Sequence, residues 1–484
     1  MKKRNIQYHI VWGVCCALIL LSGCDSFLDV QPKGTVEQKK QFEDVQGYRD
    51  AMYGIYATMA KNELYGQSLS FGFVDEIAQL YYDKYGTRQD EVYAVQKLSY
   101  KDTKVAEKID EIWTKSYECI SYVNNVITHV DKESRLDLDL SLIRGEAYAL
   151  RAFLHFDILR LFGDNIRRSP DAGGIPYATV FGLESKPVYT LKGCYEHILS
   201  DLDAASRYLK DEVKDVHDIS SPEPYLRTRF MHCNLYAVWA IKARVFHFKG
   251  DLDSAAFYAE KVISASSFEL VDSKKFASVK RYGKDNKELI WGLYTKQMAS
   301  VYKDLFLSPL GQGSALWVRS GVRNLYEVSS FSADSKDLRF TEFFFEDPSS
   351  WYEYNFVRLL GMEEKEYNLT GVCLIRLPEM YYILAESWYK KDKEKALRYL
   401  NDVRNSRGLK DIDGTKVVTY DQFFNELMQE RRKEFFGEGQ IFFFYKCNNL
   451  SFMDYSNENE ILPSKDVFVL PWPKAEQEYG VTNQ

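Results

Sequence analysis

The chain has 484 residues, of which 63 are Lys or Arg and 70 are Asp or Glu, so its formal net charge is −7. A mildly acidic chain without a basic tract lacks the electrostatic footprint of a nucleic-acid-binding protein, and no nucleic-acid partner is expected. Hydrophobic residues make up 45% of the chain, enough for a large core, and aromatic residues make up a high 15%.

The chain begins with the three parts of a secretory signal. Lys2, Lys3 and Arg4 precede an apolar run over residues 10–21, and Leu-Ser-Gly-Cys24 follows. The run is too short to cross a bilayer core of ~30 Å as a helix. We predict that residues 1–23 are a lipoprotein signal peptide and that Cys24 becomes acylated, for instance with palmitate; an ordinary cleaved signal is the alternative. Two or three acyl chains would hold Cys24 in a membrane outside the cytoplasm.

Helical periodicity dominates the chain beyond an extended tether predicted at residues 24–41. Ile112, Trp113 and Ile120, for example, fall on one apolar stripe. Gly163 stops another periodic segment, since glycine is a common helix terminator. The predicted helices span residues 42–61, 109–130, 140–162, 191–209, 231–249, 252–264, 377–390, 393–405 and 420–436.

Two pairs of these helices share a packing pattern. Ala243 on one helix faces Ala255 and Ala259 on the next, and Ala385 and Ala396 stand in the same relation further along. Small residues let paired helices approach closely, which is the packing logic of tetratricopeptide repeats. We therefore expect an all-α scaffold of tetratricopeptide-like helical hairpins; two unrelated hairpins are the alternative.

Residues 62–105 and 267–370 lack sustained helical periodicity. Both are rich in Tyr, Phe, Gly, Ser and Asp. Long irregular stretches inside a compact chain are usually functional or disordered, and aromatic content argues against disorder. These segments are expected to form a less regular, loop-rich ligand-binding half on the helical scaffold, with residues 288–293 as a short buried strand around Trp291.

Metal and disulfide chemistry have little support in the sequence. The five cysteines beyond Cys24 include no CxxC pair, and no HExxH motif occurs. His155 lies among apolar residues and is expected to be a core histidine. Asp75-Glu76 and the acids at 137–139 lack EF-hand spacing and are expected to be solvated or helix-capping. No metal and no cofactor are predicted.

Catalysis has one candidate, the series Glu430, Glu434 and Glu438. Paired carboxylates can hydrolyse glycosides. However, Arg431, Arg432 and Lys433 are interleaved with them, so we expect charged groups that pair at the rim of a packed helix. No catalytic residue is predicted, and the protein is not expected to be an enzyme.

Several segments, in this order, resemble the SusD/RagB family of surface lipoproteins that help Gram-negative bacteria to import glycans. The most distinctive is Arg144-Gly-Glu-Ala-Tyr-Ala-Leu-Arg151-Ala-Phe-Leu-His-Phe-Asp-Ile-Leu-Arg160-Leu-Phe-Gly-Asp, with Gly-Ile-Pro176 after it. The others are Cys-Asp-Ser-Phe-Leu-Asp at 24–29, Leu-Pro-Glu-Met-Tyr-Tyr-Ile-Leu-Ala-Glu at 377–386, Leu-Asn-Asp-Val-Arg-Asn-Ser-Arg-Gly at 400–408, Glu-Arg-Arg-Lys-Glu at 430–434 and Phe-Val-Leu-Pro at 468–471.

The resemblance implies a SusD-like domain over residues 42–484, with an N-terminal SusD-like region at 42–215 and a C-terminal SusD/RagB region at 270–484. It implies four tetratricopeptide-like hairpins beneath a less regular half that carries the ligand site. It also implies an outer-membrane location facing the cell exterior and a SusC-like TonB-dependent transporter as partner. An oligosaccharide ligand is expected; a peptide ligand is the alternative, and a surface hydrolase is the third possibility.

A sugar site needs exposed aromatic plates beside hydrogen-bonding side chains, usually on loops held by a rigid scaffold. The irregular regions supply six candidates. We expect Trp317 and at least one of the three tyrosines to converge on one face. The candidates are Tyr81, Tyr82 and Tyr85 in the first region and Trp317, Arg319 and Trp351 in the second.

Overall fold

The structure is a computed structural model of the chain. It describes residues 40–83, 89–135, 137–182, 186–279, 282, 285–306, 316–318, 321–328, 336–346, 354–355, 371–415, 417–456 and 458–479. Contacts within the chain define two compact units, Met1–Tyr48 and Arg49–Gln484. The predicted signal peptide with Cys24 and nearly all of the tether lie outside the described residues. The scaffold and both cavities discussed below lie in the second unit.

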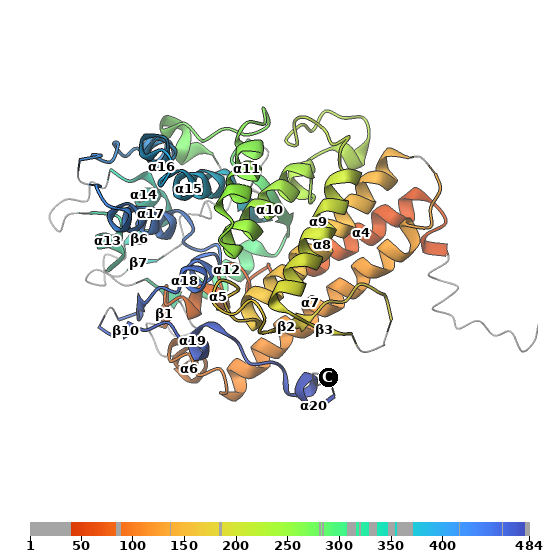
Figure 1. Ribbon diagram of the computed structural model, residues 1–484, viewed down its shortest axis with the longest axis horizontal. Coiled ribbons are helices and arrows are strands. Elements are labelled where there is room, and N and C mark those ends of the chain that lie inside the picture. Colours follow the sequence, from red (N-terminus) through yellow and green to blue (C-terminus); the bar gives the residue numbers. More distant parts are fainter. Residues whose placement is uncertain are drawn as a thin grey trace, which may run out of the picture. The chain divides into compact units, whose positions relative to one another are not determined.

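Most of the described chain is helical, and its strands are short (Figure 1). The α-helices are α4 (Val45–Met59), α5 (Phe73–Ile77), α6 (Gln89–Gln96), α7 (Thr103–Val130), α8 (Leu138–Phe162), α9 (Leu191–Tyr208), α10 (Leu235–Lys249), α11 (Leu252–Ile263), α12 (Met298–Phe306), α13 (Gly321–Leu325), α14 (Leu338–Phe343), α15 (Leu377–Trp388), α16 (Lys393–Ser406), α17 (Tyr420–Glu434), α18 (Ile441–Asn448), α19 (Lys465–Phe468) and α20 (Lys474–Tyr479).

The strands pair into antiparallel two-stranded ribbons. The longest ribbon pairs residues 289–294 with residues 371–376. The second of these strands runs directly into α15, so the ribbon connects the irregular region after α11 to the start of that helix. The ribbons are β1 (Tyr82–Asp83) with β5 (Leu316–Trp317), β2 (Gly173–Pro176) with β3 (Val188–Thr190), β4 (Leu289–Tyr294) with β8 (Gly371–Arg376), β6 (Phe345–Glu346) with β7 (Tyr354–Asn355), and β9 (Phe452–Met453) with β10 (Glu460–Ile461).

The predicted helices are confirmed, and side-chain caps set their ends. Helix α7 begins six residues earlier than predicted because Asp102 accepts a hydrogen bond from the Lys104 N–H at 3.0 Å. Helix α10 begins four residues later than predicted, where Asn234 accepts from the Ala237 N–H at 2.9 Å. The caps, rather than the apolar periodicity, decide the boundaries.

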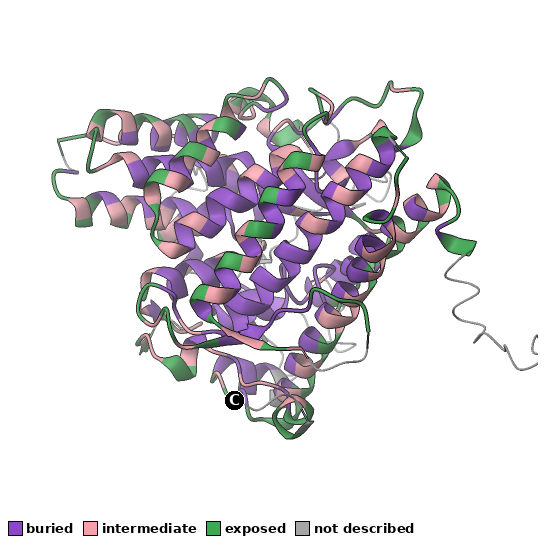
Figure 2. Cartoon of the chain, turned by 45° about the vertical axis from the view of Figure 1, so that its right-hand side comes forward, coloured by how far each residue is buried: buried purple, intermediate pink, exposed green. Residues whose placement is uncertain are grey.

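Helix α8 is the centre of the scaffold and contacts both α7 and α9. Almost all of it is buried, as the purple ribbon of Figure 2 shows, and Ala147 and Ala152 have no exposed surface. Arg151 holds the three helices together. Its guanidinium donates two hydrogen bonds of 2.7 Å to the carboxylate of Asp201 on α9 and one of 3.1 Å to Asn124 on α7.

His155 is a satisfied core histidine, as predicted. It is fully buried, and its Nε2 accepts a hydrogen bond of 2.9 Å from the Ala178 N–H. Its Nδ1 therefore carries the proton and donates to the Arg151 carbonyl at 2.8 Å. Burial lowers the pKa of His155 to about 3, so the ring is neutral at physiological pH.

The two predicted hairpins are α10 with α11 and α15 with α16, and α11 also contacts α15. The small residues that were expected at the crossings have no exposed surface: Ala243, Ala255, Ala259, Ala385 and Ala396. Two large residues on the same helices are less buried. Trp239 and Trp388 are only half-buried, and Lys261 and Lys395 lie over their rings at 4.8 and 3.3 Å.

The irregular regions contain more structure than the sequence predicted. The first carries α5 and α6, and the second carries β4 and the short helices α12, α13 and α14. Trp291 lies on a buried strand, β4, as predicted, with 0% exposure. The interpretation of Asp75 and Glu76 as solvated or capping acids was wrong, because both are buried in α5, whereas Asp137 caps α8 as expected.

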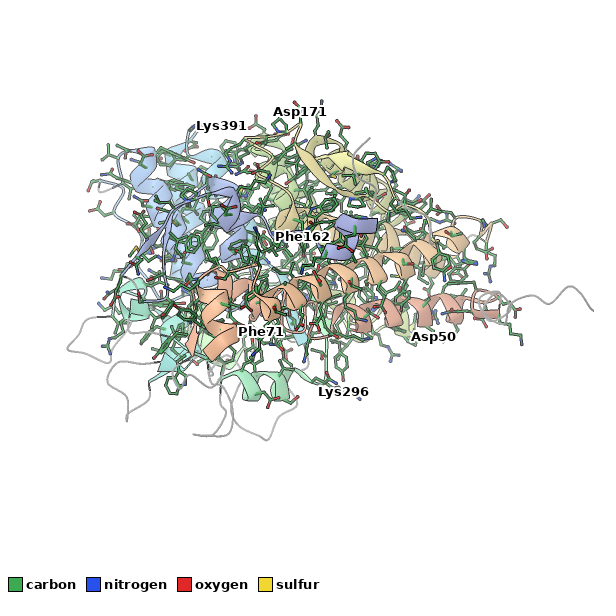
Figure 3. All side chains as sticks on the ribbon, turned by 90° about the horizontal axis from the view of Figure 1, so that it is seen from below. Asp50, Phe71, Phe162, Asp171, Lys296 and Lys391 are labelled. Carbon is green, nitrogen blue, oxygen red and sulfur yellow. The ribbon has the colours of Figure 1, made fainter. Side chains whose placement is uncertain are left out.

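Side chains fill the space between the helices, and charged ends lie at the periphery. Figure 3 shows Phe162 among packed side chains, while Lys296, Lys391 and Asp171 lie at the edges of the view. The five described cysteines are free thiols. Within the described residues, no helix combines the length and the apolarity that a membrane crossing requires.

Candidate ligand-binding site

Three segments that are far apart in the sequence line one cavity, which we call the loop cavity. They are the turn after α5, the segment from β5 to α13, and the C-terminal stretch from α17 to β9. The cavity is continuous with solvent, and its volume without the open solvent is about 70 Å³. The lining side chains that offer rings or polar groups are Gln79, Arg432, Phe436, Tyr445, Asp454 and Tyr455.

Gln79 fastens the walls of the loop cavity to one another. Its backbone has a φ of +65°, which turns the chain sharply after α5. Its side chain accepts a hydrogen bond of 3.2 Å from the Tyr455 N–H and donates one of 3.2 Å to the Gln96 carbonyl. Gln96 in turn donates to the Tyr81 carbonyl at 3.3 Å. The position of Tyr455 is therefore tied to α5 and α6.

Asp454 supplies a fixed negative charge at the cavity. Its carboxylate accepts hydrogen bonds from the Ser456 hydroxyl at 2.7 Å and from the Asn459 amide at 2.7 Å. Burial acts to raise the pKa of Asp454, but these hydrogen bonds outweigh burial and lower the pKa to about 2. The carboxylate is therefore ionised at neutral pH, and the turn that carries it is held in place.

Tyr82 and Trp317 are brought together, as the sequence predicted. They are register partners in the β1–β5 ribbon, and half-buried Tyr455 packs against the pair. Their exposure differs from the prediction: Tyr82 is 6% and Trp317 is 7% exposed, so neither is an exposed plate. The reason is the strand pairing, which brings the two irregular regions together, and of these three rings only Tyr455 lines the loop cavity.

Tyr81 is a core residue rather than a surface plate. It is 1% exposed, and the rings of Phe306 and Phe436 lie edge-on to it at centroid distances of 5.2 and 5.7 Å. The remaining predicted ligand residues, Tyr85, Arg319 and Trp351, lie outside the described residues, as does Cys24.

The sequence analysis missed Tyr455, Asp454 and Gln79 altogether. Tyr455 and Asp454 belong to a short segment rich in polar and aromatic residues, Asp-Tyr-Ser-Asn-Glu-Asn at 454–459, between two hydrophobic stretches. That composition was a usable signal, since loops of this kind carry binding residues. Gln79 gave no signal, because its role depends on a backbone turn and on a partner 376 positions away.

The glutamates of α17 are structural, but the prediction that they pair at the rim of the helix was wrong. Glu430 and Glu434 are 0% and 1% exposed. Glu434 accepts hydrogen bonds from Arg376 at 2.7 Å and from Arg407 at 2.8 and 3.0 Å. Burial acts to raise the pKa of Glu430, but Arg339 and its other cationic neighbours lower it to about 2. Every carboxylate oxygen of Glu430 and Glu434 thus accepts from a cation, which is the arrangement of a structural ion network.

The structure thus combines a scaffold of helical hairpins with a solvent-open cavity between irregular segments. Comparison with known families gives the class of protein. Residues 26–223 match the profile of proteins described as starch-binding and associating with the outer membrane, and residues 253–446 match the profile of the SusD family. The chain belongs to the SusD/RagB family, whose members are carbohydrate-binding proteins associated with the outer membrane.

Curated relatives and solved structures are consistent with this assignment. SusD-like proteins P2 and P38 of Formosa agariphila are 24% and 23% identical over 44% and 57% of this chain. The matches span 39% and 49% of those relatives' own lengths.

Two solved structures have the same fold. A SusD superfamily protein from Bacteroides thetaiotaomicron is 22% identical with a TM-score of 0.71, covering 90% of this chain and 98% of that one. A SusD-like carbohydrate-binding protein from Bacteroides vulgatus is 20% identical with a TM-score of 0.67, covering 90% of this chain and 96% of that one.

Proposed function

We propose that the protein is a cell-surface lipoprotein that captures an oligosaccharide in the loop cavity and delivers it to a SusC-like TonB-dependent outer-membrane transporter. The observation that carries the proposal is the composition of the cavity. A half-buried ring, Tyr455, stands beside the ionised acceptor Asp454 and the donor Arg432. Sugar rings present apolar C–H faces and hydroxyl groups, so a ring flanked by fixed polar groups suits them.

The buried pair of Tyr82 and Trp317 has a supporting role in the proposed site. In the proposal, the pair sets the position of Tyr455, against which it packs, rather than contacting the sugar in its own right. Tyr85, Arg319 and Trp351 are proposed as additional contacts at the edges of the site, because they follow or flank the two strands of the β1–β5 ribbon or belong to the same irregular region. Tyr81 is proposed only as a packing residue.

The proposed anchor is Cys24. Its support is the acylation pattern Leu-Ser-Gly-Cys24 after a basic and then apolar start, together with the outer-membrane association of the family. Replacing Cys24 with Ala should release the protein from the membrane fraction. Continued surface display of Cys24→Ala with undiminished palmitate labelling would contradict the proposed anchor.

The ligand class is tested by isothermal titration of the purified protein against a glycan panel and a peptide pool. Saturable heat with one class of glycan and none with peptides is the expected result. Saturable heat with peptides alone would replace oligosaccharide by peptide as the ligand. Chromatography of the glycan after prolonged incubation is expected to show it intact, and shortened products would make the protein a hydrolase.

A further inference from the structure

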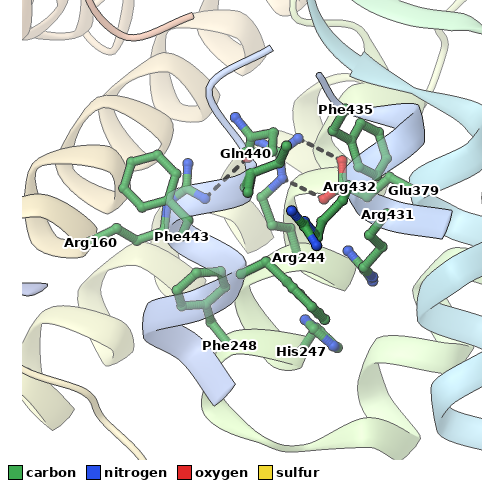
Figure 4. Close-up of a pocket in the computed structure, with 12 residues that line it drawn as sticks. Arg160, Arg244, His247, Phe248, Glu379, Arg431, Arg432, Phe435, Gln440 and Phe443 are labelled. Carbon is green, nitrogen blue, oxygen red and sulfur yellow. Dashed lines mark hydrogen bonds and ion pairs between the residues drawn. The ribbon is translucent and has the colours of Figure 1, made fainter. Parts of the chain in front are cut away.

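A second cavity lies inside the scaffold, where α8, α10, α15, α17 and α18 meet. We call it the arginine cavity, because four arginines line it: Arg160, Arg244, Arg431 and Arg432 (Figure 4). Its volume is about 20 Å³. A cavity needs roughly 10–15 Å³ to hold one water molecule, so there is room for a single small occupant.

The arginines leave several buried donors unused. The Nε and one Nη of Arg244 donate hydrogen bonds to Glu379, at 2.7 and 2.6 Å, and Arg160 forms an ion pair with Asp157. Five further N–H nitrogens are shielded from solvent and have no hydrogen-bond partner among the described residues: Arg160 Nε, Arg244 Nη1, Arg431 Nε, Arg431 Nη2 and Arg432 Nε.

Arg431 forms no ion pair with any residue that the structure describes. It is 7% exposed, and no described carboxylate lies within ion-pair distance of it. The neighbouring Glu386 is bonded to His247 at 2.8 Å. The Arg431 guanidinium carbon lies 4.8 and 5.7 Å from the ring centroids of Phe444 and Tyr382, and its Nε and Nη2 have no hydrogen-bond partner among the described residues. Burial without a partner lowers the pKa of Arg431.

The balance of charge around the cavity is positive. Among the described residues, the four guanidinium groups face three carboxylates, those of Asp157, Glu379 and Glu386, and each carboxylate is already bonded. Buried polar groups in proteins are nearly always hydrogen-bonded, and a buried charge without a counter-charge is strongly destabilising. Such a cluster of donors calls for an occupant that the described residues do not supply.

We propose that the arginine cavity binds a small inorganic anion of the size of chloride. Water is the competing occupant, but a water molecule must also donate two hydrogen bonds. The lining is poorer in acceptors than in donors: the Gln440 Oε1 already accepts from Arg160 at 3.3 Å, and both Glu379 oxygens accept from Arg244, at 2.7 and 2.6 Å. An anion accepts from every donor and donates nothing, which matches a lining of unused N–H groups.

Bromide tests the site directly, because it replaces chloride and scatters anomalously. Crystals of the purified protein grown in bromide should show an anomalous peak inside the arginine cavity, beside Arg431. Density without an anomalous signal at that position would assign the cavity to water and overturn the proposal.

Thermal unfolding supplies a second measurement that does not depend on crystals. With ionic strength held constant by sodium gluconate, added chloride should raise the melting temperature by a few degrees in a saturable manner, since a ligand that binds only the folded state stabilises it. Arg431→Met should abolish this dependence, whereas the control Arg398→Met, at an exposed position of α16, should retain it. A chloride dependence that is absent from the wild type, or unchanged in Arg431→Met, would contradict the proposal.

Discussion

The helical scaffold and the loop cavity treat polar side chains in opposite ways. In the scaffold outside the arginine cavity, many charged groups are buried and bonded several times over, as Glu434 is by Arg339, Arg376 and Arg407. Around the loop cavity, the polar side chains are fewer and several are half-buried, and the fixed acceptor Asp454 is held by its own turn. The scaffold therefore gains rigidity from saturated networks, while the cavity keeps polar groups available for a ligand.

Breaking the scaffold network should have the largest effect on stability. Glu434→Gln removes one negative charge from among three arginines, and the loss of one partner from a buried ion network typically costs about 3–5 kcal/mol. Urea unfolding should show this loss in the free energy of unfolding. Glu426→Gln, a half-buried position on the same helix, is the control and should cost less than about 1 kcal/mol. Equal midpoints for the two variants would contradict the structural role of Glu434.

Trp317→Ala tests whether the β1–β5 pair belongs to the packed interior. Because Trp317 is 7% exposed, truncation should cost about 3 kcal/mol, in the range found for buried aromatic residues. Differential scanning calorimetry measures the change. A melting temperature equal to that of the wild type would mean that Trp317 is a surface plate, as the sequence alone suggested.

Acid should weaken the scaffold in two stages. Burial lowers the pKa of His155 from 6.5 to about 3, and burial likewise lowers that of His217 to about 4. The unfolded chain therefore binds more protons below pH 6.5, and stability is lost as the pH falls from 6.5 toward these values. Glu430, with a pKa lowered from 4.5 to about 2, adds to the loss below pH 4.5.

Urea unfolding at pH 7, 5 and 4 measures the acid effect. We expect a decrease on the order of 2 kcal/mol before the carboxylates begin to titrate. His155→Gln should flatten the upper part of the profile. A free energy of unfolding that stays constant from pH 6.5 to 4.5 would show that these histidines are not buried in their neutral form.

Overpacking at the centre of the scaffold should have a smaller effect. Ala152 on α8 is fully buried, and extra methylene groups in a packed core cost about 1–3 kcal/mol, so Ala152→Leu should lower the melting temperature. Ala57→Leu, at an exposed position of α4, is the matched control and should leave it unchanged. A neutral Ala152→Leu would place α8 at the periphery.

The same contrast explains what the sequence could predict. Apolar periodicity and small residues such as Ala243 and Ala385 indicated the helices and their pairing. The face on which a helix packs is determined by residues three and four positions apart, and that spacing can be read from the sequence. The loop cavity depends on contacts over hundreds of positions, such as Gln79 with Tyr455, and on two-residue strands that carry no period. Tyr82 and Trp317 were predicted to meet, but their burial follows from a pairing that only the fold reveals.

The central claim is that ligand recognition resides in the loop cavity, and Tyr455→Ala tests it most directly. Tyr455 is half-buried and lines the cavity, so its loss should cost little stability while removing the ring against which a sugar packs. Tyr399→Ala, a half-buried tyrosine on α16, is the control. Isothermal titration with the glycan that the wild type binds should show at least a tenfold weaker affinity for Tyr455→Ala, wild-type affinity for Tyr399→Ala, and nearly unchanged melting of Tyr455→Ala. Wild-type affinity in Tyr455→Ala would contradict the account.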